Sequence, residues 1–151
     1  MSRGFSRVRR ALLAAAILII GMACTTGAVR AQQLEQTLER VARGLERGDA
    51  DAISRLGARA GISLDIDGNS VGPLGPRQAS AVLRRLFGAR ETIAVRTTLV
   101  RRVGGEPQRA FAEITWNARA RGTTVPEQAK FFVAFVEEDA RWQVTEIRLL
   151  R

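Results

Sequence analysis

The sequence predicts an α+β domain in which a curved, mainly antiparallel sheet wraps around three helices. Two observations lead to this fold class. From Glu91 to Arg151, four segments with strand-like patterns are separated by short turn sequences, as expected of consecutive antiparallel strands. Before them, apolar residues recur at helical spacing, most clearly over residues 33–47. Helices followed by a run of strands are typical of α+β domains.

The first two helices are predicted from an apolar stripe and its caps. Over residues 33–47 the apolar positions advance by steps of four, three and four, and the stripe consists of Leu34, Leu38, Val41 and Leu45. Gly48 suits the C-terminal end of this helix. Asp49 or Asp51 can then cap a short second helix over residues 50–56.

A short strand and a third helix follow. Residues 61–66 alternate as a strand, and residues 71–75 are expected to pair back on it as an edge segment. Pro76 suits the first turn of a helix over residues 77–87, which is expected to end at Gly88. The apolar side of this helix consists of Ala79, Val82, Leu83, Leu86 and Phe87.

The first two strands of the closing run show a period of two. Over residues 91–103, Ile93, Val95 and Leu99 share one face, which predicts a half-buried strand. Over residues 109–121, one face carries small and apolar residues and the other carries polar residues together with Phe111. The first of these faces consists of Ala110, Ala112, Ile114, Trp116 and Ala118.

The last two strands predict a central position and a bend. Residues 128–137 carry apolar side chains on both faces, as in a strand covered from both sides or central in a sheet. Over residues 142–150 the alternation slips by one residue near Thr145 and Glu146, which predicts a β-bulge and a curved sheet. Eight side chains from these helices and strands are expected to be largely buried: Leu38, Val41, Leu83, Phe87, Ile114, Trp116, Phe135 and Val144.

The N-terminal segment indicates export. Residues 1–10 carry four arginines, and residues 11–23 form an apolar run too short for a comfortable membrane span. Three outcomes stay open: a signal peptide over 1–31 cleaved after Ala31, a lipoprotein signal that lipidates Cys24, and an uncleaved anchor. We expect one domain over 32–151, an exported protein that is periplasmic or secreted, and membrane contact only through this segment.

Composition excludes several chemistries. The chain has no histidine and no tyrosine, and its single cysteine, Cys24, lies in the leader. These absences exclude a Cys/His zinc site, a cysteine nucleophile in the mature region and a Ser-His-Asp triad. No metal site and no cofactor are therefore predicted.

The basic charge is concentrated in the leader. Of 24 basic residues, five precede residue 32, where no acid occurs, so the net charge of +9 falls by more than half without them. Nucleic-acid binding is not expected for this reason. Arginine suits anion recognition, and a surface for anionic lipid or polymer is an alternative function, although a general compositional bias also explains the arginines. Its candidate residues are Arg84, Arg85, Arg90, Arg96, Arg102, Arg119 and Arg148.

The order of elements resembles the nuclear transport factor two-like superfamily, whose domains form a cystatin-like cone. The residues that carry the resemblance are the stripe that begins at Leu34, residues 48–53, and the closing strand from Trp142 to Leu149. Within that superfamily, residues 33–151 are similar to secreted bacterial proteins of unknown function. The resemblance implies a sheet wrapped around helices with a pocket at the open end, which some members use for isomerisation, dehydration or hydrolysis and others for binding.

No catalytic residue carries over from that resemblance. The isomerase members use a tyrosine–aspartate site and the dehydratase members a histidine–aspartate pair, and this chain lacks tyrosine and histidine. Glu113 or Asp65 could act as an unpartnered base if burial raised its pKa, but the strand pattern favours solvent-facing positions for both. The candidate pocket residues, for which core packing is the favoured alternative, are Phe111, Glu113, Trp116, Phe132 and Phe135.

The favoured hypothesis is an exported envelope protein that acts by binding, without chemistry. Its expected partner is a small apolar ligand or an envelope protein, and a homodimer through the sheet is a further alternative. A small pocket enzyme that uses an unpartnered carboxylate is the other alternative. Fold class alone does not choose among these functions.

Overall fold

The computed structural model describes residues 27–151, and the chain divides into two units, Met1–Gln33 and Leu34–Arg151. In the first unit the described residues, 27–33, are helical. The predicted arginine-rich start, the apolar run and the lipidation candidate Cys24 lie outside the described residues. Within residues 27–151, no helix has the length and apolar character needed to cross a membrane.

The second unit begins within a helix that spans residues 27–47 and ends at Gly48, whose φ of +64° is the left-handed conformation of a helix C-terminus. The four residues of the predicted stripe, Leu34, Leu38, Val41 and Leu45, are all buried. Helix α2 (Ala50–Ser54) follows and is shorter than predicted. Asp49, not Asp51, caps it, because the Ala52 N–H donates to Asp49 Oδ1 at 2.9 Å.

Helix α3 (Pro76–Ala89) buries the predicted apolar side, with Val82 only partly covered. The prediction that this helix ends at Gly88 is wrong, since Gly88 and Ala89 are both helical. Glycine weakens a helix but does not stop it. The helix ends where Arg90 becomes extended (φ −135°, ψ 145°) and pairs with Ala120 in the sheet.

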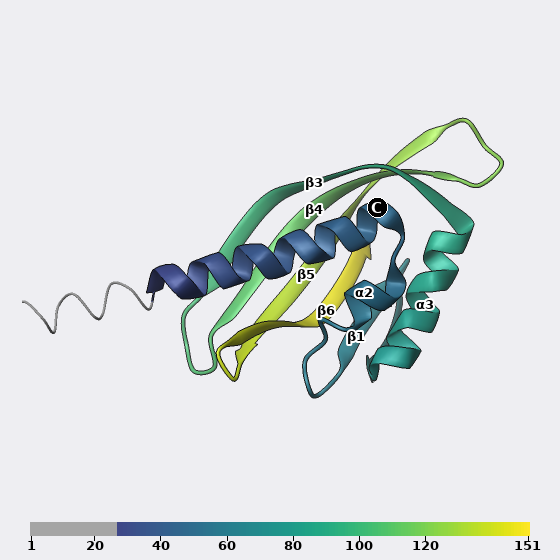
Figure 1. Ribbon diagram of the computed structural model, residues 1–151. Helices are drawn as coiled ribbons and strands as arrows, with labels where there is room; N and C mark the ends of the chain where they lie inside the picture. The colour runs from purple at the N-terminus through teal and green to yellow at the C-terminus, as the bar shows by residue number, and fades with distance from the viewer. Residues whose placement is uncertain (1–26) are drawn as a thin grey trace, which may run out of the picture. The chain divides into compact units, whose positions relative to one another are not determined.

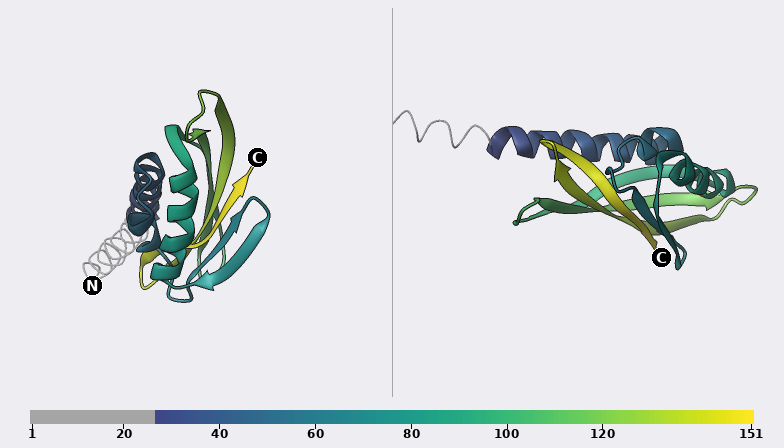
Figure 2. Two further views of the ribbon diagram at one scale, coloured as in Figure 1. Left: turned by 90° about the vertical axis from the view of Figure 1, so that its right-hand side faces the viewer. Right: turned by 90° about the horizontal axis from the view of Figure 1, so that it is seen from below.

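The six strands form one sheet in the order β2-β1-β6-β5-β4-β3, and every neighbouring pair is antiparallel except β1 and β6. The predicted α+β class with a mainly antiparallel sheet is therefore confirmed. In the second unit, residues 34–47, α2 and α3 lie on the same face of the sheet (Figures 1 and 2). The strands are β1 (Ile62–Ile66), β2 (Asn69–Leu74), β3 (Arg90–Val103), β4 (Arg109–Ala120), β5 (Pro126–Glu138) and β6 (Arg141–Leu150).

The predicted bulge in the last strand is confirmed. Ala134 of β5 pairs with Glu146, whereas the next residue, Phe135, pairs with Val144, so Thr145 is the extra residue. The Thr145 hydroxyl donates to the Ala134 carbonyl at 3.3 Å. A bulge bends a strand, and this one is where the alternation of β6 slips.

The prediction that residues 91–103 form a strand is confirmed, but the prediction that Ile93, Val95 and Leu99 share one half-buried face is wrong. Strand β3 is an edge strand, and Ile93 and Leu99 are exposed. Its pairing with β4 shifts register between Thr92 and Ala94 and again between Thr97 and Leu99. Each shift moves the following residues to the other face, so Thr92 and Val95, not Ile93 and Leu99, point toward the helices.

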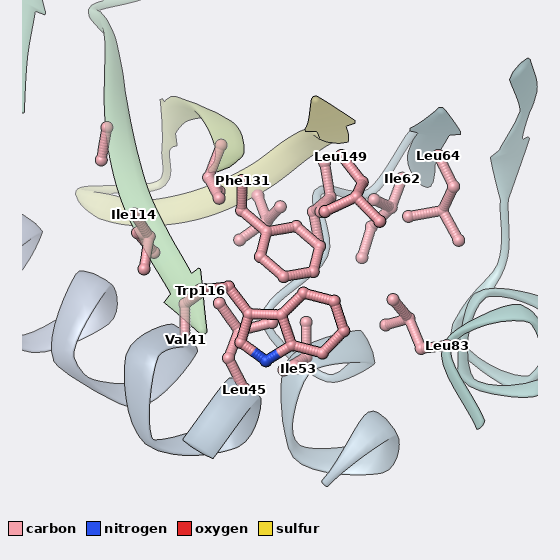
Figure 3. Close-up of a cluster of buried hydrophobic side chains, with 14 of the residues drawn as sticks. Val41, Leu45, Ile53, Ile62, Leu64, Leu83, Ile114, Trp116, Phe131 and Leu149 are labelled. Carbon is pink, nitrogen blue, oxygen red and sulfur yellow. The ribbon is translucent and has the colours of Figure 1, made fainter. Parts of the chain in front are cut away.

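The core lies between the helices and the inner face of the sheet. All eight residues predicted to be largely buried are buried. Figure 3 shows the Trp116 indole beside Phe131, with Leu45 and Ile53 from the helices close to its nitrogen. The ring centres of Trp116 and Phe131 lie 5.2 Å apart and the ring planes meet at 50°. The two aromatic side chains therefore pack as a tilted pair inside the core.

Candidate functional site

The inner face of the sheet is filled with side chains. On β4 and β5 it carries Ala110, Ala112, Ile114, Trp116, Phe131 and Phe135, all of them buried in one hydrophobic cluster with the helices. Among the described residues, the buried polar side chains are Thr37, Ser54 and Ser80. None of them is a carboxylate, so the interior holds no acid–base group.

Two consecutive hydrogen bonds link Trp116, Thr92 and Leu45 at one end of this interior. The Trp116 Nε1–H donates to Thr92 Oγ1 at 2.8 Å, and the Thr92 hydroxyl donates to the Leu45 carbonyl at 3.0 Å. Arg90 lies 5.9 Å from the centre of the Trp116 ring. The two bonds join the edge strand β3, the inner strand β4 and the helix that ends at Arg47, and they satisfy a donor that burial would otherwise leave unpaired.

The five candidate pocket residues do not form one site. Trp116 and Phe135 are buried in the core on the inner face, and Phe135 also borders the cavity that Phe111 and Phe132 line. Phe111, Glu113 and Phe132 lie on the outer face, which points away from the helices. Cross-strand pairing places Glu113 opposite Phe132, and the rings of Phe111 and Phe132 stack with their centres 5.3 Å apart.

An open cavity of about 480 Å³ lies along this outer face, and we call it the outer groove. The stacked pair Phe111 and Phe132 contributes to its lining, and Ala134 and Thr145 extend it toward β6. Arg101 lies 6.0 Å from the centre of the Phe111 ring. Other residues that line the groove include Val103, Arg109, Phe135, Glu138 and Glu146.

The carboxylates on and near the outer groove have partners. Glu146 accepts a hydrogen bond from Arg148 at 2.5 Å, and Glu138 accepts one from the Arg59 N–H at 3.2 Å. The two base candidates are also paired. Glu113 accepts from Lys130 at 3.3 Å, and Asp65 lies 3.7 Å from Arg148. Each candidate is therefore held by a basic side chain at the surface of the sheet.

The predicted arginine surface is divided by the fold. Arg90 pairs with Glu127, Arg119 with Glu91, and Arg148 with Asp65 and Glu146. Arg85, Arg96 and Arg102 are exposed and form no ion pair among the described residues. The seven arginines are spread over α3, β3, β4 and β6, so the structure does not bring them together.

Arg84 is held by Asp51. The Arg84 Nη2 group donates to both carboxylate oxygens of Asp51, at 2.7 Å to Oδ1 and 2.6 Å to Oδ2. The hydrogen bond from Arg84, with a second from the Ser80 hydroxyl, lowers the pKa of Asp51 below its ordinary value. The same contact raises the pKa of Arg84. This cluster joins α2 to α3.

Residues 27–151 contain no group of three or more acidic, cysteine or histidine side chains placed to hold a metal ion. The outer groove offers a few polar groups around an aromatic surface. Three of its lining residues, Phe111, Phe132 and Phe135, were identified from sequence. Val103, Arg109 and Glu146 were missed because they come from three different strands and meet only through the pairing.

Solved structures share this fold. A DUF4783 family protein from Bacteroides uniformis ATCC 8492 superposes with a TM-score of 0.62 at 12% identity, covering 75% of this chain and 94% of that one. A domain with a cystatin-like fold from Nostoc punctiforme PCC 73102 has a TM-score of 0.60 at 15% identity, covering 83% and 75%. The fold is therefore the cystatin-like, nuclear transport factor two-like fold that the sequence predicts.

A third similar structure carries a ligand. A hypothetical protein with a ketosteroid isomerase-like fold from Catenulispora acidiphila DSM 44928, in complex with trimethylamine, has a TM-score of 0.60 at 16% identity, covering 76% of this chain and 84% of that one. No protein-family model and no curated protein matches the sequence. At these identities the likeness establishes the fold alone.

Proposed function

We propose that this chain is an exported, non-catalytic binding protein whose outer groove takes a small apolar or aromatic ligand. The observation that carries the proposal is the division of aromatic residues between the two faces of the sheet. Trp116 and Phe131 fill the inner face, whereas Phe111 and Phe132 stay half-buried on the outer face beside a cavity of about 480 Å³. That volume lies within the roughly 300–1,000 Å³ of small-molecule sites.

The lining of the outer groove fits such a ligand. Stacked aromatic rings provide a flat apolar surface, and a further ring adds about 0.5–1.5 kcal/mol beyond its buried area when it packs on them. Arg109, Thr145 and Glu146 supply polar groups at the edges, which would orient a ligand that carries one donor or acceptor.

Binding without chemistry follows from the state of the carboxylates. General base catalysis needs a carboxylate that can take a proton from a bound substrate. Glu146 and Glu113 on the outer face are each bound to a basic side chain. Among the described residues, the inner face carries no buried carboxylate that could take this role in their place.

The proposed location rests on the sequence of the leader. Arginines at 3–10 followed by a short apolar run are typical of export signals. The intact mass of the protein recovered from cells tests this part. A start at Gln32 or a lipidated Cys24 supports export, and an intact Met1 in the soluble cytoplasmic fraction refutes it.

Fluorescence titration of the full chain with the neutral apolar dye N-phenyl-1-naphthylamine tests the ligand site. We expect saturable binding that Phe132→Ala weakens by about tenfold, because the dye loses a stacking partner worth about 1.4 kcal/mol. Ala134→Leu should weaken binding as well by filling the groove while both rings remain. Ile93→Ala, which trims an exposed apolar side chain on the same sheet, should leave binding unchanged.

Two results would contradict this proposal. One is dye binding that neither groove variant changes. The other is a dimer in sedimentation experiments that Phe132→Ala dissociates, because the outer face would then be a contact between copies of the chain. Far-UV circular dichroism of each variant ensures that the comparison is made between folded proteins.

A further inference from the structure

A second hollow lies elsewhere in the second unit, between the end of the first helix and α2. Its volume is about 310 Å³, and four arginines line it: Arg40, Arg43, Arg47 and Arg55. We call it the arginine groove. Figure 1 shows α2 directly after the end of the first helix.

Helical spacing gathers three of these arginines. Arg40, Arg43 and Arg47 are three and four residues apart, so they lie on one side of the helix. Gly44 lies between them and allows α2 to approach closely. A Cβ at Gly44 would lie 2.5 Å from Ile53 Cγ1, and Ile53 is fully buried. This close approach brings Arg55, which directly follows the last residue of α2, to the same hollow.

The positive charge in this groove is poorly compensated within the described residues. Arg43 contacts Glu39 at 3.5 Å, and both side chains are exposed. Arg40, Arg47 and Arg55 form no ion pair there. Arg55 acts on Asp51 only at a distance, since Asp51 is bound by Arg84 and Ser80.

Asp49 is the single carboxylate that lines the groove, and its Oδ1 accepts the capping hydrogen bond from the Ala52 N–H. Apart from the exposed pair of Arg43 with Glu39, which does not line the groove, the arginines therefore share one carboxylate that is already engaged. Like charges gathered this way repel one another, and an anion bound among them would remove that repulsion. The arginines predicted from sequence to form an anionic-ligand surface are dispersed, whereas these four converge.

We propose that the arginine groove binds a phosphate-bearing anion. Guanidinium groups present paired N–H donors that match phosphate oxygens, and such charge-assisted bonds are about twice as strong as neutral ones. The volume is at the small end of ligand sites, which suits a diphosphate or one phosphorylated head group. This site is separate from the outer groove, because no residue lines both.

Calorimetric titration of the full chain with inorganic pyrophosphate tests the site. We expect saturable binding that Arg47→Gln/Arg55→Gln weakens by about a hundredfold, at about tenfold for each charge-assisted bond lost. The matched control is Arg85→Gln/Arg102→Gln, which removes the same charge from two exposed, unpaired arginines elsewhere. This control should bind nearly as well as the unchanged protein.

A thermal readout gives an independent check. A ligand that binds only the folded state raises the melting temperature, and the rise grows with the ratio of ligand concentration to Kd. Pyrophosphate should raise the Tm of the unchanged protein and of the control pair but not that of the groove pair. Equal loss of binding in both pairs would overturn the proposal, because the effect would then depend on net charge and not on this groove.

A vesicle-binding experiment distinguishes a lipid head group from a free phosphate compound as the ligand. Vesicles of phosphatidylcholine with and without phosphatidylglycerol are mixed with the same three proteins. Capture that depends on phosphatidylglycerol and is lost only in the groove pair identifies a lipid head group. Binding of pyrophosphate without such capture identifies a free phosphate compound. Binding of neither probe refutes the site, and leaves the outer groove untouched because its dye is uncharged.

Discussion

Thr92→Val tests whether the filled interior depends on the hydrogen-bond chain at its end. The substitution keeps the shape of the side chain and removes its hydroxyl, so the buried Trp116 Nε1–H loses its acceptor. The Leu45 carbonyl keeps a donor, since it also accepts from the Gly48 N–H at 3.3 Å. The cost is therefore mainly that of one buried unsatisfied donor, about 1–3 kcal/mol.

The measurement is guanidinium unfolding followed by circular dichroism, supported by thermal unfolding. A loss of about 2 kcal/mol should lower the Tm by about 8 °C in a domain of this size. Thr92→Ser keeps the hydroxyl and should cost less than half as much. In a Trp116→Phe background the indole N–H is absent, so no buried donor loses its acceptor. Thr92→Val should then leave the free energy of unfolding nearly unchanged.

The double-mutant cycle gives the result that would refute the reasoning. We expect a coupling of at least about 1 kcal/mol between Thr92 and Trp116. A coupling near zero, or a Thr92→Ser variant as unstable as Thr92→Val, would mean that the hydroxyl does not hold the indole in place.

Three further predictions concern caps, turns and charge. Asp49→Ala should lower the free energy of unfolding by about 1 kcal/mol through loss of the α2 cap, while Asp49→Asn should cost less. Gly61→Ala should lower the free energy of unfolding in urea by more than about 1 kcal/mol, because Gly61 has a φ of +97° and a Cβ would lie 2.7 Å from a carbonyl oxygen of β2. Gly104→Ala is the control and should be neutral, since a Cβ at Gly104 would meet no atom within 4 Å. Arg84→Gln should destabilise the protein at pH 7. Its difference from the unchanged protein should shrink as the pH falls below about 4, because the lowered pKa of Asp51 contributes stability that is present above the ordinary pKa and lost as the carboxylate is protonated in the folded state. A difference that stays constant as the pH falls from about 5 into the acid range would contradict this.

The elements with one fully buried face could be predicted from sequence. Strand β4 alternates because Ile114 and Trp116 face the helices. The slip near Thr145 marks the bulge because a one-residue insertion exchanges the two faces. Strand β3 could not be predicted in this way. Its two register shifts and its edge position leave Ile93 exposed, and neither is encoded in the period of its residues.

The two grooves show why sites were harder to predict than the fold. The apolar character of Phe111 and Phe132 was clear, but their position on the outer face follows from pairing between β4 and β5. The spacing of Arg40, Arg43 and Arg47 is local, whereas Arg55 joins them only because α2 packs at Gly44. Contacts between distant segments are what the sequence pattern lacks.

The central claim is that side chains of residues 27–151 fill the space between the helices and the sheet, and that apolar ligands bind on the outer face of the sheet. The most direct test is a ¹H–¹⁵N NMR titration of the full chain with N-phenyl-1-naphthylamine, comparing the Trp116 indole N–H with the backbone amides of Phe111, Phe132 and Ala134. We predict that the three amides shift with the dye while the indole signal, held by Thr92, stays in place. A shift of the Trp116 indole with unmoved amides would place the ligand inside the fold and contradict the claim.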